Sequence, residues 1–211
     1  MCIIKNLRTK DKECLLTELE GLIGDFANNQ RKIASLFRGI FLDSIFANRI
    51  LYTDVNRRHR FSLFILLLKE SKNLQSDYKL SSEIFKEAYI SSDNIYKQIN
   101  ECIYHFSPHE YLVGLLNHIN PLTLMNEKEK EFYDGLQNRI TIYRGCSEAE
   151  VKNGKLGISW TDKIEYAEKY VFYEKYNNKD LGFIIVKKIW KQNVWCVFKH
   201  PTDPYFEIIY I

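Results

Sequence analysis

The sequence is poor in the residues that interrupt regular secondary structure, with nine glycines and four prolines among 211 residues. Disordered chains combine few apolar side chains with a high net charge, and cannot bury enough surface to offset chain entropy. Here 45% of the residues are hydrophobic and 14% are aromatic. This composition excludes a disordered chain and predicts one large folded domain or two small ones.

The chain also lacks a large excess of charge of either sign. It contains 30 Lys and Arg and 27 Asp and Glu, which gives a net charge of +3. A protein that coats DNA must neutralise many phosphates, so this balance argues against that class. A local basic cluster is formed by Arg57, Arg58, His59 and Arg60. We interpret it as the solvated start of a helix rather than as an anion site.

Clustered metal ligands and paired cysteines are missing too. The cysteines are odd in number and widely scattered, at Cys2, Cys14, Cys102, Cys146 and Cys196. Without a Cys-x-x-Cys motif or a group of histidines, no metal site is predicted. No signal peptide precedes the cysteines, so they indicate free thiols in a reducing cytoplasm.

No apolar run is long enough for a membrane helix, which requires about 20 residues. The longest extends from Phe61 to Leu68 and is interrupted by Ser62. We expect this run to form a buried helix and expect no membrane association.

The first two thirds of the chain show helical patterns. Apolar residues at helical spacing form two stripes, one over 15–26 and one over 33–46 (Leu15, Leu16, Leu19, Leu22, Ile23 and Phe26; Ile33, Leu36, Phe37, Ile40, Phe41, Ile45 and Phe46). Capping boxes at Ser107 with Glu110, and at Asn126 with Glu129, mark two further helix starts. Ser92 or Asp93 is the expected cap of a helix over about 95–106.

The pattern changes after Asn138, where β-type runs begin: Ile140 to Tyr143, Ile158 to Thr161, Phe183 to Val186, Val194 to Phe198 and Phe206 to Ile211. Asp162 is the expected N-cap of one helix among them. The predicted fold class is therefore α+β, with a mostly helical N-terminal part followed by a compact β-rich domain.

Three short motifs in the β-rich part carry chemically useful residues. They are Tyr143-Arg144-Gly145, Gly157-Ile158-Ser159-Trp160-Thr161 and Tyr205-Phe206-Glu207-Ile208-Ile209. Each occurs easily by chance. In this combination and order they resemble the arginine, serine, glutamate signature of the ADP-ribosyltransferase superfamily, particularly its compact bacterial and phage members.

The resemblance implies an antiparallel-rich ADP-ribosyltransferase domain over residues 107–211, after a helical accessory or targeting region over 1–106. It also implies NAD as a substrate. The catalytic residues would be Arg144, Ser159 and Glu207. The residues that contact NAD would be Tyr143, Arg144, Gly145, Ser159, Thr161 and Tyr170.

The chemistry of NAD explains these roles. A planar guanidinium at Arg144 suits paired hydrogen bonds to phosphate or ribose oxygens. Gly145 lets the main chain approach the nicotinamide amide closely, although a simple turn also needs a glycine. Cleavage of the nicotinamide bond develops positive charge on the ribose, which the Glu207 carboxylate would stabilise. Ser159 would orient that carboxylate or contact the same ribose. Trp160 points to the opposite strand face, and we expect it in the core.

The sequence departs from the family pattern two residues before Glu207. Many members carry Gln or Glu at that position to select the acceptor, and here it is Tyr205. His200, Asp203 and Tyr205 are the expected acceptor-facing residues, with His200 or Asp203 as a candidate base. Alternatively, His200 is merely solvated, as a lone histidine in a loop usually is. For Tyr205 we favour packing on the protein itself.

The sequence therefore predicts a mono-ADP-ribosyltransferase that modifies a macromolecule, and we interpret it as a phage or bacterial effector or toxin against a host system. A protein acceptor is preferred, with nucleic acid as the alternative acceptor. The contrasting hypothesis is a non-catalytic partner-binding protein on the same scaffold, because fold does not dictate function.

Overall fold

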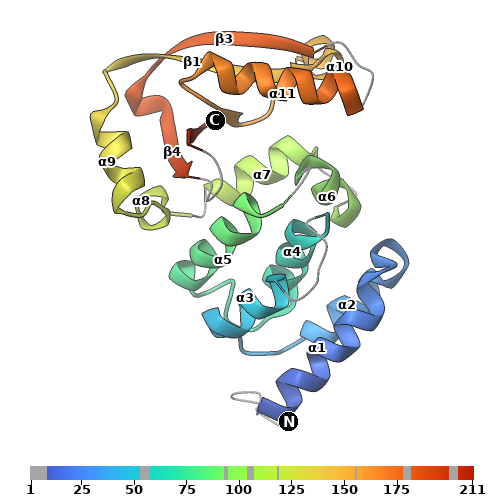
Figure 1. Cartoon of the computed structure of the whole chain (residues 1–211). Helices are drawn as coiled ribbons and strands as arrows, with labels where there is room; N and C mark the ends of the chain where they lie inside the picture. Colours follow the sequence, from blue (N-terminus) through green and yellow to red (C-terminus); the bar gives the residue numbers. More distant parts are fainter. Residues whose placement is uncertain are drawn as a thin grey trace. The chain divides into compact units, whose positions relative to one another are not determined.

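The computed structural model describes residues 9–52, 58–92, 95–103, 107–117, 119–154, 156–177, 182–199 and 204–211, without the side chains of 173–177. The chain divides into two compact units, Met1–Asn120 and Pro121–Ile211. In the described ranges the first unit is helical, and every strand belongs to the second (Figure 1). The α+β prediction is thereby confirmed.

The boundary between the units lies after Asn120, later than the predicted boundary at residue 106. Helix α7 (Pro108–Leu116), which we assigned to the second domain, packs against α6 (Ile95–Cys102) and belongs to the first unit. The capping box of Ser107 and Glu110 and Pro108 at the helix start are present as predicted. These local signals determine where α7 begins and leave open which core it joins.

The first unit contains the remaining helices α1 (Thr9–Ile23), α2 (Phe26–Phe37), α3 (Ser44–Tyr52), α4 (Arg60–Glu70) and α5 (Tyr78–Ile90). Helix α4 is buried from Phe61 to Leu67, which confirms the predicted buried helix. The rings of Phe61, Phe64 and Phe85 contact one another at centroid distances of 5.6–6.0 Å. These aromatic rings form the core between α4 and α5.

The two apolar stripes do not form two continuous helices. Helix α1 ends at Ile23, and Phe26 begins α2. The side-chain amide of Asn29 donates to the Leu22 carbonyl at 3.0 Å, which satisfies a carbonyl at the end of α1. The second stripe is interrupted between α2 and α3, where Asp43 accepts from the Phe46 amide. Ile45 is 76% exposed, so its assignment to an apolar stripe was wrong.

Two other predictions in the first unit also need correction. Arg60 is not a solvated residue, because its guanidinium donates to the carbonyls of Leu51 and Ser91 at 3.1 Å. Ser92 does not cap α6, since its buried hydroxyl has no hydrogen-bond partner among the described residues. The alternative cap, Asp93, lies outside the described residues, as does Arg57.

The second unit contains the strands β1 (Arg139–Ser147), β2 (Ser159–Trp160), β3 (Gly182–Trp190), β4 (Val194–Lys199) and β5 (Phe206–Tyr210). Its helices are α8 (Pro121–Leu124), α9 (Glu127–Gly135), α10 (Glu148–Asn153), α11 (Ile164–Asn177) and the short η1 (Lys191–Asn193). All five β-type runs are confirmed as strands. Helix α10 was not predicted, and α11 begins after Lys163 rather than directly after Asp162.

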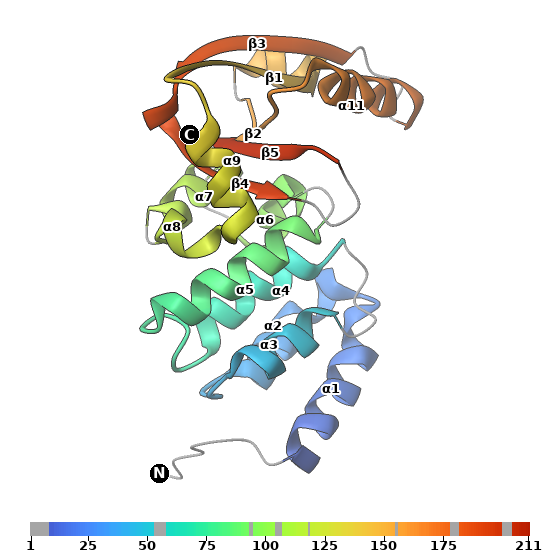
Figure 2. The same ribbon diagram turned by 60° about the vertical axis from the view of Figure 1, so that its left-hand side comes forward.

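The strands form an antiparallel β1–β3 pair and an antiparallel sheet in the order β2-β5-β4. A bridge between Tyr143 and Thr161 links the two, so the strands follow one another as β3, β1, β2, β5 and β4 (Figure 2). Helix α11 packs along β1 and β3 (Figure 1). The three predicted motifs thus lie on neighbouring strands.

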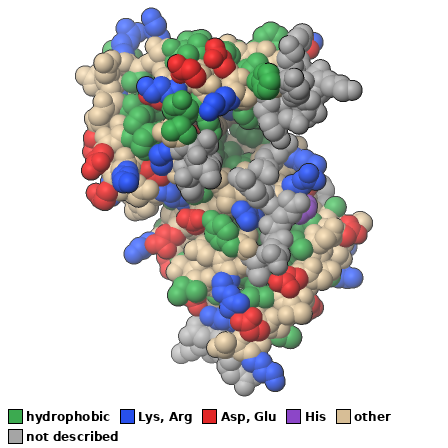
Figure 3. Space-filling model, viewed as in Figure 1, with side chains coloured by type: hydrophobic (Ala, Val, Ile, Leu, Met, Phe, Trp, Pro, Cys, Tyr) green, Lys and Arg blue, Asp and Glu red, His purple; other side chains and the backbone are tan. Residues whose placement is uncertain are grey.

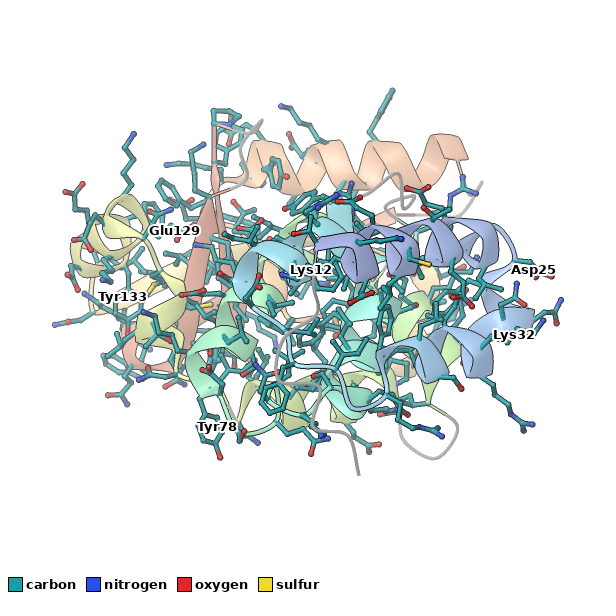
Figure 4. All side chains as sticks on the ribbon, turned by 90° about the horizontal axis from the view of Figure 1, so that it is seen from below. Lys12, Asp25, Lys32, Tyr78, Glu129 and Tyr133 are labelled. Carbon is teal, nitrogen blue, oxygen red and sulfur yellow. The ribbon has the colours of Figure 1, made fainter. Side chains whose placement is uncertain are left out.

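Helix α9 is attached to the far side of this array by a buried carboxylate. Glu129, labelled in Figure 4, accepts from the amides of Asn126 at 2.7 Å and Lys199 at 2.8 Å. Its side chain is fully buried. The first bond completes the predicted capping box, and the second joins α9 to the end of β4.

One face of the molecule shows charges of both signs, in line with the near-neutral composition (Figure 3). Basic and acidic side chains are interspersed over the face shown in Figure 3. Within the described ranges, no helix has the length and hydropathy that a membrane-spanning segment requires.

Candidate functional site

The candidate site lies where β1 and β2 separate. Tyr143 and Thr161 exchange two main-chain hydrogen bonds, of 2.7 and 2.9 Å. Beyond this bridge the two strands belong to different sheets. The next residue of β1 is Arg144, and its Nη1 donates to the main-chain carbonyl of Ser159 at 2.8 Å. The arginine side chain therefore spans the gap that the separating strands leave.

A carboxylate holds the other terminal nitrogen of this guanidinium. Arg144 Nη2 lies 2.6 Å from Glu150 Oε1, and the two side chains are 11% and 26% exposed. Coulombic attraction between such partly buried charges is stronger than between solvated ones. Arg144 is thus paired within the protein, whereas we had predicted only its contact with a phosphate or ribose.

Gly157 provides the space for this arrangement. A methyl group at Gly157 would overlap Arg144 Nη2 and come within 2.7 Å of Arg144 Cζ. The Gly157 amide also donates to Glu150 Oε1 at 3.3 Å. Gly157 therefore contributes through its missing side chain and through its main-chain donor.

Glu150 was missed by the sequence analysis. Its second oxygen accepts from the Ser147 amide at 3.2 Å, while the Ser147 hydroxyl accepts from the Glu150 amide. This is a capping box at the start of α10. The Ser-x-x-Glu spacing could have revealed the cap. It could not have revealed the contact with Arg144, which depends on how the chain folds back.

Ser159 and Glu207 lie on one face of the β2–β5 pair. Ser159 is opposite Ile209, and residues opposite each other in an antiparallel pair share a face. Glu207 is two residues before Ile209, so the alternation of the strand returns it to that face. The Glu207 residue is 7% exposed. The pairing of β2 with β5 therefore puts the predicted serine and glutamate on the same face of the sheet.

Trp160 lies on the other face, as predicted. It is opposite Ile208, is 3% exposed, and contacts the Tyr210 ring edge-on at 5.9 Å. The side chain belongs to the core and not to the candidate site.

Gly145 and Tyr170 lie next to each other because α11 packs tightly on β1. A methyl group at Gly145 would overlap the Ala167 carbonyl oxygen and come within 3.0 Å of Tyr170 Cβ. Tyr170 is 46% exposed. The absence of a side chain at Gly145 therefore has a structural reason, the approach of α11, beside its predicted role toward nicotinamide.

Protein-family models, curated proteins and solved structures were all compared with the chain. None of them matches.

Tyr205, the expected acceptor-facing aromatic, packs on α11. Its ring lies 5.5 Å from the Tyr166 ring, and the Lys169 ammonium lies 5.6 Å from its centroid. This confirms packing on the protein as the interpretation we favoured. His200 and Asp203 lie outside the described residues.

A thiol, Cys146, lies two residues after Arg144 on β1. Burial raises the pKa of the Cys146 thiol, Glu150 raises it further and Arg144 opposes the shift. The thiol donates weakly to the Phe183 carbonyl at 3.6 Å. In the described part of the chain, no group of three or more His, Cys, Asp and Glu side chains could hold a metal ion.

A pocket of about 440 Å³ lies at the opposite end of β1. Its lining includes Phe132, Arg139, Thr141 and Asp162. None of the predicted site residues that the structure describes contributes to it.

Proposed function

We propose that the second unit is a mono-ADP-ribosyltransferase domain that transfers ADP-ribose from NAD to a macromolecular acceptor, with protein as the preferred acceptor class. One observation carries this proposal. The Arg144 guanidinium meets Ser159 where β1 and β2 separate, and Glu207 shares the face of Ser159 on the adjoining strand. These two relations, a hydrogen bond to the Ser159 main chain and a shared strand face, support the proposal.

In this proposal NAD is a substrate, and each residue has a separate task. Arg144 would bind pyrophosphate or ribose oxygens through its planar donors. The bond between nicotinamide and ribose would break with its electron pair leaving on nicotinamide, which develops positive charge on the sugar. The Glu207 carboxylate would stabilise that charge by accepting a hydrogen bond from a ribose hydroxyl. The acceptor would then bond to the ribose carbon and lose a proton.

The test is the substitution Glu207→Gln, which removes the charge and keeps the size of the side chain. We expect the rate of NAD cleavage to fall by about 100-fold or more, since removal of one stabilising group at a transition state has effects of that order. The dissociation constant of NAD should change little. Unchanged cleavage by the variant would contradict the assignment of Glu207.

A second candidate function is a non-catalytic protein that binds a partner through this scaffold. The ion pair of Arg144 and Glu150 favours it, because a partly buried pair can serve packing alone. In that case purified protein would show no NAD binding. A measurable NAD dissociation constant that Arg144→Ala abolishes would exclude this candidate.

A further inference from the structure

Glu150 makes more contacts than a helix cap requires. A capping box uses the Ser147 hydroxyl and one oxygen of the carboxylate, here Glu150 Oε2. The other oxygen, Oε1, is turned to Arg144 Nη2 at 2.6 Å and to the Gly157 amide at 3.3 Å. One carboxylate therefore joins the end of β1, the start of α10 and the segment that leads into β2.

These contacts fix the plane of the guanidinium. Nη2 is held by Glu150 and Nη1 by the Ser159 carbonyl, so both terminal nitrogens are anchored. A guanidinium whose two terminal nitrogens are both held by hydrogen bonds keeps its remaining donors in one orientation before any ligand binds. The ordering of a long, rotamer-rich side chain then costs nothing at the moment of binding.

We propose that Glu150 is a positioning residue, which acts through Arg144 to prepare the site for the pyrophosphate of NAD. This inference rests on the proposed function and names a residue that the three predicted motifs do not contain. Gly157 contributes to the same positioning of Arg144, because any side chain at Gly157 would displace the guanidinium.

The substitution Glu150→Gln separates positioning from capping. Glutamine keeps an oxygen for the Ser147 amide, so the helix cap survives, while the charge that holds Arg144 is lost. We expect the NAD dissociation constant, measured by calorimetry on the full chain, to rise about tenfold, as for loss of one charge-assisted hydrogen bond. KM for NAD should rise with it, while kcat changes less.

Two further variants test whether the loss of NAD affinity comes from Arg144 or from the helix cap. Ser147→Ala removes the hydroxyl of the cap without touching Arg144, and it should leave NAD affinity unchanged. Gly157→Ala displaces the guanidinium by a different route, and it should reproduce the loss of affinity seen with Glu150→Gln. Tryptophan fluorescence checks folding, because Trp160, Trp190 and Trp195 all lie in the second unit.

A double-mutant cycle tests whether Glu150 acts through Arg144. In an Arg144→Lys background, Glu150→Gln should weaken NAD binding much less than in wild type, because coupled residues are non-additive. Equal weakening in both backgrounds would overturn the proposal. So would a Ser147→Ala variant that loses as much affinity as Glu150→Gln.

A readout without NAD separates this inference from the proposed function. In wild type the anchored Arg144 should give resolved guanidinium nitrogen signals by NMR, and these should merge in Glu150→Gln but persist in Ser147→Ala. If wild type binds no NAD and the signals still merge, the proposed function fails and the positioning of Arg144 stands. If the signals do not merge, positioning by Glu150 is disproved whether or not NAD binds.

Discussion

At the scale of single residues, the site depends on two glycines that each make room for a neighbouring group. Gly157 admits the Arg144 guanidinium, and Gly145 admits helix α11. A flexible side chain can move away from an added methyl, but the carbonyl oxygen of a helix backbone cannot move alone. Gly145 is therefore the less tolerant of the two.

We predict that Gly145→Ala destabilises the second unit by about 1–3 kcal/mol, the usual cost of overpacking a close contact. The reason is the overlap of the added methyl with the Ala167 carbonyl oxygen. Urea unfolding followed by tryptophan fluorescence measures the effect. Gly135→Ala is the matched control, because nothing lies within 4 Å of a methyl at that position. Equal stability of the two variants would contradict the tight packing of α11 on β1.

Single residues also show which contacts a sequence pattern can predict. Ser107 with Glu110 and Asn126 with Glu129 form the capping boxes that we predicted, because a cap involves only residues within one helical turn. The pairing of Arg144 with Glu150 could not be predicted in the same way. It depends on the direction in which α10 leaves the end of β1, and the capping box of Ser147 and Glu150 fixes the start of the helix but not that direction.

At the scale of elements, Glu129 connects a helix to a strand that is 70 residues away in the chain. We predict that Glu129→Gln destabilises the second unit by about 1–3 kcal/mol, the cost of leaving one buried partner unsatisfied. The amide nitrogen of glutamine cannot accept, so either Asn126 or Lys199 loses its acceptor. Tryptophan fluorescence in urea again provides the measurement.

The control for Glu129 is two residues earlier on the same helix. The Glu127 side chain is 86% exposed and pairs with Lys130, so Glu127→Gln should change stability by less than about 0.5 kcal/mol. If both variants unfold at the same urea concentration, Glu129 does not hold β4.

In the first unit, His59 joins α2 to the start of α4. Its ring stacks on Phe26 at 5.1 Å. Burial lowers the pKa of His59, Glu101 opposes this shift, and Lys97 and Arg58 reinforce it. Because the folded-state pKa lies below the unfolded value, the contribution of His59 to stability is complete above about pH 6.5 and is lost as pH falls through the folded pKa.

We predict that His59→Phe reduces the loss of stability between about pH 7.5 and about pH 5, since phenylalanine keeps the stacking but cannot take up a proton. Urea unfolding followed by far-UV circular dichroism at both pH values measures the helical unit. The comparison is the difference between wild type and variant, because carboxylates elsewhere titrate equally in both. An identical pH dependence would show that His59 does not contribute.

At the scale of the whole molecule, the acceptor decides what the proposed reaction does. Interspersed charges on the face seen in Figure 3 and the net charge of +3 offer little attraction for a polyanion. Tyr205 packs on Tyr166 and Lys169 of α11.

We predict that wild-type protein incubated with labelled NAD and cell lysate labels a protein, whereas Glu207→Gln labels nothing. Digestion of the lysate products with a protease, or with a nuclease, identifies the class of acceptor. Label that is released by nuclease and resists protease would show that the acceptor is nucleic acid. Label that appears equally with the variant would contradict the catalytic role of Glu207.

The sequence by itself determined the features that depend on near neighbours. These are the capping boxes, the strand alternation that buries Trp160, the buried run in α4, and the order of helices before strands. Each follows from contacts within a few residues or from a regular period.

Only the tertiary structure decided which of these pieces meet. It assigned α7 to the first unit, packed α11 on β1 at Gly145, and set Glu150 against Arg144. Such contacts join residues through the pairing of strands and the packing of helices. Their geometry is therefore a property of the whole fold, and a local pattern does not contain it.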